Sequence, residues 1–192
     1  PVTVSHRKGT TVVDCDEGPR DDTSIEKLAT LPPVFRTDGV ITAGNSSMIS
    51  DGAAALVVGS EAAARRHAIT PLARVVASAT VGGPPEDLFL APVEAIHEVL
   101  KKGRRRLGEI DLFEINEAFA AQMLGCLRRV EISPDRVNVH GGAIALGHPI
   151  GASGARVLVT LVHALHALQL KTGIATLCLG GGNAVATLIE RC

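Results

Sequence analysis

Short apolar runs that favour strands alternate, from about residue 51, with segments that carry a helical apolar stripe, and this alternation most constrains the fold. The expected strands are residues 53–59, 72–81, 110–115, 172–179 and 184–189. The expected helices are residues 60–65, 92–102, 117–129 and 152–168. Such alternation is typical of α/β proteins, in which helices cover the faces of a sheet.

The last two expected strands are separated by residues 180–183 (GGGN), a glycine-rich link that predicts a hairpin. A hairpin at the end of an alternating chain indicates an antiparallel edge on an otherwise parallel sheet. We therefore expect an α/β fold with a mixed, mostly parallel five-stranded sheet, helices on both faces and a C-terminal antiparallel hairpin.

Residues 1–50 are rich in turn formers and charges and show little periodicity. Residues 11–13 predict a short strand, and residues 23–31 predict a short helix that ends at Pro32 and Pro33. Because long irregular segments are uncommon inside compact domains, we expect residues 1–50 to be a linker or wrapping segment of something larger. The chain opens on Pro1 rather than Met, so we expect the true start to lie upstream or to have been removed.

Composition narrows the possible partners. A formal net charge of −1, with four Phe and no Trp or Tyr, argues against binding to nucleic acid or to an anionic membrane surface. No apolar run reaches membrane-spanning length. The basic run at residues 101–106 follows an expected helix, where cations complement the helix dipole, and we interpret it as solvated surface.

The four cysteines form no CxxC pair, and no histidine lies at zinc-like spacing from them, so we expect no metal site. A disulfide framework is not expected in a chain of this size with so few cysteines. A reducing, cytoplasmic location fits this cysteine usage best.

Three segments place reactive side chains where elements end. In residues 114–119 (EINEAF), Asn116 either caps a helix or holds a water or substrate oxygen. In residues 141–154, glycines surround His148, a lone histidine that is either structural or catalytic. In residues 178–182 (CLGGG), Cys178 is either a small buried hydrophobe or a reactive thiol beside free backbone N–H groups.

Taken in order, NEAF at residues 116–119, GHP at 147–149 and CLGGG at 178–182 resemble the three C-terminal motifs of thiolases. Residues 42–53 (TAGNSSMISDGA) also resemble the stretch that precedes the second half-fold of that family, although Met48 and Ser50 stand where Gly and Asn are commoner. The resemblance is to the C-terminal half of an acetyl-CoA acetyltransferase or 3-ketoacyl-CoA thiolase. It implies a thiolase-like half-fold in residues 51–192, preceded by the end of the N-terminal half in residues 1–50.

The resemblance also implies an activity, namely Claisen condensation of two acyl-CoA molecules or thiolysis of a 3-ketoacyl-CoA in fatty acid metabolism. His148 matches the histidine that activates the nucleophilic cysteine, and Cys178 matches the acid/base cysteine. Asn116 matches the residue that holds a water in the first oxyanion hole, and Gly180 matches the N–H donor of the second. These residue types suit the chemistry, because enolate formation beside a thioester needs a tuned base and donors for the developing oxyanion.

The resemblance places Ser47 and Phe119 at the coenzyme A pocket. It implies acyl-CoA or coenzyme A as substrates, no cofactor, and as partners a second copy of the chain in a homo-oligomer and an N-terminal half-domain. The nucleophilic cysteine of the family lies in that N-terminal half. Cys15 is flanked by Asp14 and Asp16, which oppose thiolate formation, so it is not expected to replace the nucleophile.

We therefore expect the complete protein to be an acyltransferase and this chain alone to be inactive. Two other interpretations remain: an inactive fragment or assembly subunit, and a ketosynthase-like condensing enzyme. A ketosynthase would carry an HGTGT-like segment, whereas this chain has NEAF at residues 116–119. Acyl-chain length and the direction of the reaction are not determined by these residues.

Overall fold

The structure is a computed structural model that describes residues 1–192. A two-stranded sheet contains β1 (Val2–His6) and β2 (Gly9–Val13). A four-stranded sheet contains β3 (Ala73–Gly82), β4 (Leu112–Ile115), β5 (Thr172–Leu179) and β6 (Asn183–Arg191) in the order β3-β6-β5-β4. The helices are α1 (Ile25–Ala29), α2 (Glu61–Arg66), α3 (Ala91–Gly103), α4 (Ala120–Val130), α5 (Ala143–Leu146) and α6 (Ser153–Ala167).

The α/β class, the helices on both faces and the C-terminal antiparallel hairpin are confirmed. Two details of the expected sheet are wrong, since it has four strands and only β4 and β5 form a parallel pair. β3, β4 and β5 run in one direction, but the hairpin reverses β6 and inserts it between β3 and β5. Residues 53–59 form no strand and leave Val57 fully exposed, because no strand of this chain lies beside them.

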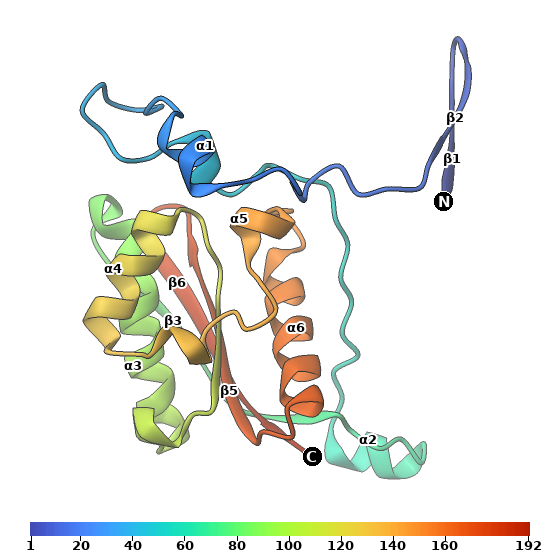
Figure 1. Cartoon of the computed structure of the whole chain (residues 1–192). Coiled ribbons are helices and arrows are strands. Elements are labelled where there is room, and N and C mark those ends of the chain that lie inside the picture. Colours follow the sequence, from blue (N-terminus) through green and yellow to red (C-terminus); the bar gives the residue numbers. More distant parts are fainter.

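Side chains alternate between the two faces of the sheet, as the pleat requires. On one face, Phe113, Ile174 and Leu188 pack with α3 and α4. On the other face, Leu112 and Ile189 pack against α6. α3 and α4 therefore cover one face and α6 covers the other (Figure 1), and both faces have an apolar core.

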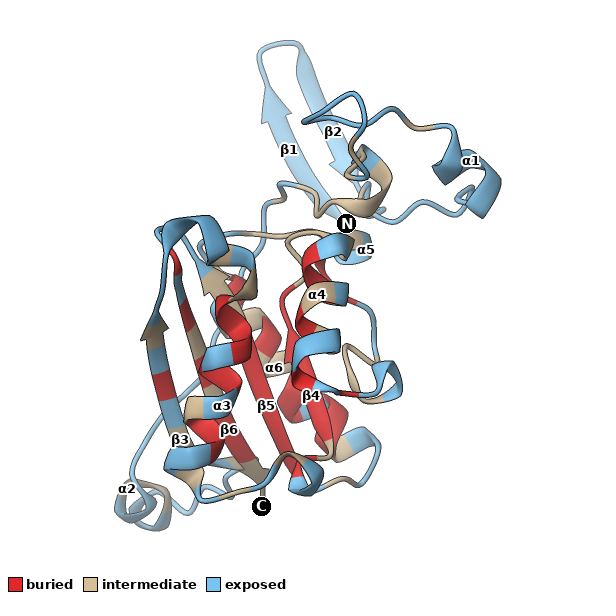
Figure 2. Cartoon of the chain, turned by 90° about the vertical axis from the view of Figure 1, so that its left-hand side faces the viewer, coloured by how far each residue is buried: buried red, intermediate tan, exposed pale blue.

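Residues 1–45 lie outside this core. Every residue of β1 and β2 is exposed, and their hairpin projects away from the body (Figures 1 and 2). The expected strand at residues 11–13 is part of β2, and the expected helix at residues 23–31 is α1, which Ser24 caps. The segment around α1 lies across the end of the sheet at which α5 is found.

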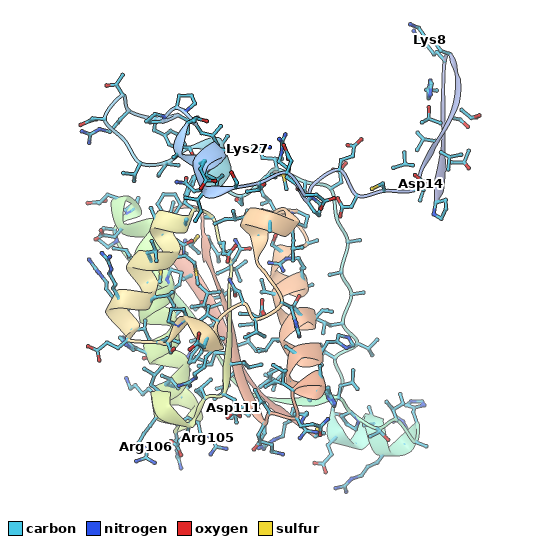
Figure 3. The ribbon with its side chains drawn as sticks, in the orientation of Figure 1. Lys8, Asp14, Lys27, Arg105, Arg106 and Asp111 are labelled. Carbon is cyan, nitrogen blue, oxygen red and sulfur yellow. The ribbon has the colours of Figure 1, made fainter.

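The opposite end of the sheet carries charge. Arg105, Arg106 and Asp111 lie there, away from the α1 segment (Figure 3). Arg106 is paired with Glu109, and Arg105 lies 3.7 Å from Glu190, so part of the basic run is locally neutralised. None of the helices is both long and apolar enough to cross a membrane.

Two opposite charges lie inside the protein at the sheet-to-α6 layer. Glu114 on β4 is 1% exposed, and its Oε1 has no hydrogen-bond partner. Arg156 on α6 has its Nε and Nη1 buried without partners. Burial raises the pKa of Glu114 to about 7, although the positive charge of Arg156 acts in the opposite direction.

Glu114 makes stability depend on pH. Its folded pKa of about 7 lies above its ordinary value of 4.5, so the folded state holds a proton that the unfolded state releases. This proton's contribution to stability is intact at low pH and is lost as pH rises through 7. We expect the free energy of unfolding of Glu114→Gln, relative to wild type, to rise by about 2 kcal/mol between pH 5 and pH 8.

Urea unfolding at the two pH values measures this difference. Glu17→Gln, which removes an exposed carboxylate, is the matched control and is expected to show no such rise. If the difference in free energy of unfolding between Glu114→Gln and wild type is the same at pH 5 and pH 8, the prediction is wrong.

Candidate active site

The parallel pair β4 and β5 brings two of the predicted site residues to one edge of the sheet. Ile115 lies opposite Thr176, and the backbone N–H of Asn116 donates to the Thr176 carbonyl over 3.0 Å. Asn116 follows the last residue of β4, and Cys178 lies two residues beyond Thr176 on β5. Because parallel strands end at the same edge, both side chains are placed where ligands of open α/β sheets bind.

Asn116 does not cap the following helix, contrary to one of the two expectations for it. α4 begins at Ala120 after Phe119 in the N-cap position, and no side chain caps it; the Gln122 Oε1 accepts from the Ala118 N–H, just before the helix, at 3.1 Å. Asn116 is 1% exposed, its Nδ2 lies 3.4 Å from His148 Nε2, and its Oδ1 has no partner. A buried amide oxygen without a donor is costly, so this side chain is suited to receive one from a bound molecule.

His148 is held by its backbone on a loop that crosses residues 46–50. Its N–H donates to the Met48 carbonyl over 2.8 Å, and Ile49 forms an isolated parallel bridge with it. Gly147 has φ of +95°, and a Cβ there would lie 2.2 Å from Ser50 Oγ. Only glycine fits this combination of backbone angle and close approach.

The imidazole of His148 is half-buried and is bound at both nitrogens. Nδ1 lies 2.6 Å from Ser153 Oγ, and Nε2 faces Asn116. Burial and the positive charge of Arg156 lower the pKa of His148 below its ordinary value. The ring is therefore a neutral base at physiological pH.

Glu117 anchors the loop that carries His148 through two hydrogen bonds. Its carboxylate accepts from the Ile144 N–H at 3.1 Å and from Asn138 Nδ2 at 3.0 Å. A Cβ at Gly142 would overlap this carboxylate, so glycine is needed there. The acidic residue next to Asn116 therefore ties the α5 loop to the end of β4.

Cys178 and Gly180 lie at the β5–β6 hairpin. Cys178 is partly buried, and burial raises the pKa of its thiol. Gly181 and Gly182 have φ of +83° and +87°, which shape the turn. Gly180 is exposed, and its N–H makes no backbone hydrogen bond, which leaves it available as a donor.

Ser47 and Phe119 are neighbours, as residues of one binding pocket would be. The Ser47 N–H and its hydroxyl both donate to the Ala118 carbonyl over 3.1 Å, so the hydroxyl is anchored to the loop after β4. Ser46 forms an antiparallel bridge with Phe119. The Phe119 ring makes edge-to-face contacts with Phe35 and Phe89, with centroids 5.9 Å and 5.2 Å away.

The other cysteines lie in different surroundings. Cys126 is fully buried on α4, where its thiol contacts the Phe89 carbonyl at 3.4 Å and the Gln122 amide at 3.5 Å. Cys15 and Cys192 are exposed. Cys178 differs from them in lying at the carboxyl end of β5.

Sequence reasoning missed three supporting residues, Ser153, Glu117 and Arg156. Ser153 was detectable as a hydroxyl at a helix start five residues after a candidate histidine. Arg156 follows Ser153 by three residues, so both lie on one face of α6. Their contacts with the site depend on how α6 packs, and a linear pattern does not contain that information.

The assembled edge combines a neutral imidazole, a thiol, a buried amide and an unbonded backbone N–H. A base and an acid that flank hydrogen-bond donors can move protons while a developing oxyanion is stabilised. No group of three or more His, Cys, Asp or Glu is placed to hold a metal ion. The geometry suits acyl chemistry carried out by side chains.

Comparison with protein families gives two matches along the chain. The thiolase C-terminal domain matches residues 69–191, and the thiolase N-terminal domain matches residues 1–62. A probable acetyl-CoA acyltransferase of Staphylococcus aureus is 50% identical over 192 residues, which is 100% of this chain and 49% of that protein. The chain thus spans about half the length of the curated relatives it matches.

Solved structures give the same result. The acetyl-CoA acetyltransferase of Bacillus anthracis superposes with a TM-score of 0.94 at 45% identity, over 100% of this chain and 49% of that one. Human mitochondrial 3-ketoacyl-CoA thiolase in complex with CoA gives a TM-score of 0.85 at 40% identity, over 96% and 46%. Thiolases act on coenzyme A thioesters and need no metal or other cofactor. With a family model matched over more than half of its residues, this chain belongs to the thiolase family.

Proposed function

We propose that this chain provides the proton-transfer and oxyanion-binding part of an acyl-CoA acetyltransferase. The complete enzyme would catalyse Claisen condensation of acyl-CoA or thiolysis of a 3-ketoacyl-CoA. The contact between His148 and Asn116 carries this proposal, since it joins a neutral base to a buried amide whose oxygen is unpaired. A water bound to that oxygen would complete a donor site beside Nε2 for the thioester oxygen.

In this proposal, the nucleophilic cysteine comes from the N-terminal half that the family possesses. His148 Nε2 accepts the proton of that thiol, and the thiolate attacks the acyl carbonyl carbon to form an acyl-enzyme. In condensation the leaving group is the coenzyme A thiolate, and in thiolysis it is the enolate of acetyl-CoA; in either case it receives its proton from the Cys178 thiol. Cys15 and Cys192 are exposed and Cys126 is buried on α4, so in this proposal the nucleophile comes from a further half-domain.

Cys178 is proposed as the group that exchanges a proton with the substrate α-carbon or the coenzyme A thiol. Its raised pKa favours the protonated thiol as the resting form and makes the corresponding thiolate a stronger base. Removal of a proton beside a thioester needs a strong base, so this shift suits the step. The Gly180 N–H is proposed to stabilise the enolate oxygen, and Ser47 and Phe119 are proposed to line the pantetheine path.

Residues 1–50 are proposed to be the closing part of the N-terminal half, and residues 51–192 the C-terminal domain. The N-terminal family match at residues 1–62 supports this division, although it extends past residue 50. The fully exposed Val57 and largely exposed Val58 suit a segment that is covered by a further half-domain. A homo-oligomer in fatty acid metabolism is proposed on family resemblance, and a cytoplasmic location because Cys178 must stay reduced.

The exposed apolar run at residues 53–59 also favours a second interpretation, in which the chain is an assembly subunit or an inactive fragment. The ketosynthase-like alternative has lost its support, because the matching family is the thiolases. Assay of the chain with and without the nucleophile-bearing half decides between the enzyme and the subunit.

The purified 192-residue chain is expected to show no thiolysis of acetoacetyl-CoA, because its site lacks the nucleophile. Loss of the 3-ketoacyl-CoA absorbance upon addition of coenzyme A measures the rate. Turnover by this chain above the rate of buffer would show that a cysteine within it acts as the nucleophile.

In the complete enzyme, His148→Ala and Cys178→Ala are each expected to lower kcat for thiolysis by at least about 100-fold, as loss of an acid or base does. Cys126→Ala removes the buried cysteine of α4, whose thiol contacts Gln122 and Phe89 and has no role in the proposed mechanism, and serves as the matched control. It is expected to keep the wild-type kcat. Near-wild-type turnover by either of the first two variants would remove the role proposed for that residue.

A further inference from the structure

The first residue of α6 makes two hydrogen bonds that together determine where His148 carries its proton. Ser153 is fully buried, and its Oγ lies 2.6 Å from His148 Nδ1 and 2.9 Å from the Pro149 carbonyl oxygen. A carbonyl oxygen only accepts, so the 2.9 Å contact is a hydrogen bond only when the hydroxyl hydrogen points to Pro149. Ser153 Oγ then has only lone pairs left for His148, which means that Nδ1 carries a hydrogen and donates it.

The opposite tautomer leaves conflicts at both ends of the ring. If the hydroxyl donated to Nδ1 instead, Ser153 Oγ and the Pro149 oxygen would face each other as two acceptors at 2.9 Å. Nε2 would then carry a hydrogen that points at Asn116 Nδ2, which is itself a donor. With the hydrogen on Nδ1, every one of these contacts joins a donor to an acceptor.

We propose that Ser153 is a positioning residue that fixes His148 as the Nδ1–H tautomer, so that the lone pair of Nε2 faces Asn116 and the substrate. This inference rests on the proposed function, and it concerns a residue that touches no substrate. The position of Ser153 is itself fixed, because its backbone N–H donates to the same Pro149 carbonyl over 2.8 Å at the start of α6.

The fixed tautomer lets one histidine serve two successive steps. Nε2 first accepts the proton of the nucleophilic thiol, which leaves a thiolate and an imidazolium. The new Nε2–H then donates to the thioester oxygen while Nδ1–H stays on Ser153. With the hydrogen on Nε2 at the outset, the ring would meet the thiol with a donor and could not accept its proton.

Ser153→Ala is a clean test, because it removes one hydrogen-bond partner and little else. The Pro149 carbonyl keeps the backbone N–H donors of residues 152 and 153, both at 2.8 Å. Ser153→Thr retains the hydroxyl and is the rescue variant. Thr160→Val removes a hydroxyl two turns further along α6 and is the matched control.

Imidazole ¹⁵N NMR of the full chain at pH 8 reads the tautomer directly, with the His148 signals identified by their loss in His148→Gln. Wild type, Ser153→Thr and Thr160→Val are expected to show a protonated Nδ1 and an unprotonated Nε2. In Ser153→Ala, a substantial Nε2–H population is expected. A protonated Nε2 in wild type, or an unchanged tautomer in Ser153→Ala, overturns the proposal.

In the complete enzyme, Ser153→Ala is expected to lower kcat for acetoacetyl-CoA thiolysis by about 10- to 100-fold with little change in KM, and Ser153→Thr to restore most of it. A wild-type kcat in Ser153→Ala overturns the catalytic part of the proposal. If no variant and no wild-type preparation shows thiolysis, the proposed function fails while the NMR measurement still decides the tautomer. The two failures are therefore distinguishable.

Discussion

The parallel pairing of β4 with β5 is the interaction on which the candidate site depends. It places Ile115 opposite Thr176 and continues one step further, where the Asn116 N–H bonds to the Thr176 carbonyl. A shift of one residue would turn the side chains of β4 to the other face of the sheet. Phe113 would then leave the α3 side of the core, so core packing and site geometry are held by one register.

The carboxyl edge of the sheet also shows how the protein tolerates buried polar groups. Glu114, Asn116 and Arg156 each keep a buried atom without a partner, an arrangement that costs stability. Burial and the Arg156 charge lower the pKa of His148, whereas burial raises the pKa of Glu114 to about 7 against the effect of that same charge. Burial of these polar groups thus lowers the stability of the fold and at the same time shifts the pKa values of the candidate site, as is common in active sites.

Local patterns in the sequence predicted most elements, because periodicity reports which faces are buried. These patterns gave a wrong prediction where a strand can form only by pairing with another strand. Residues 53–59 have the composition of a buried strand, yet no strand of this chain pairs with them, so they remain exposed. Asn116 resembled a helix cap, but α4 begins only at Ala120, and the Asn116 side chain faces His148 instead.

The sequence by itself determined the α/β class and the hairpin and indicated the candidate site residues, because turn glycines, apolar periodicity and three motifs are local properties. Tertiary structure alone decided that β6 lies between β3 and β5, and that Ser153 and Asn116 hold opposite sides of one imidazole. The pairing of β3 with β6 joins residues as distant as Ala73 and Arg191, and the contact between Asn116 and His148 joins residues 32 positions apart. The two imidazole contacts form because α6 packs on the sheet at the edge where β4 ends. Packing between distant segments cannot be deduced from any short stretch of the sequence.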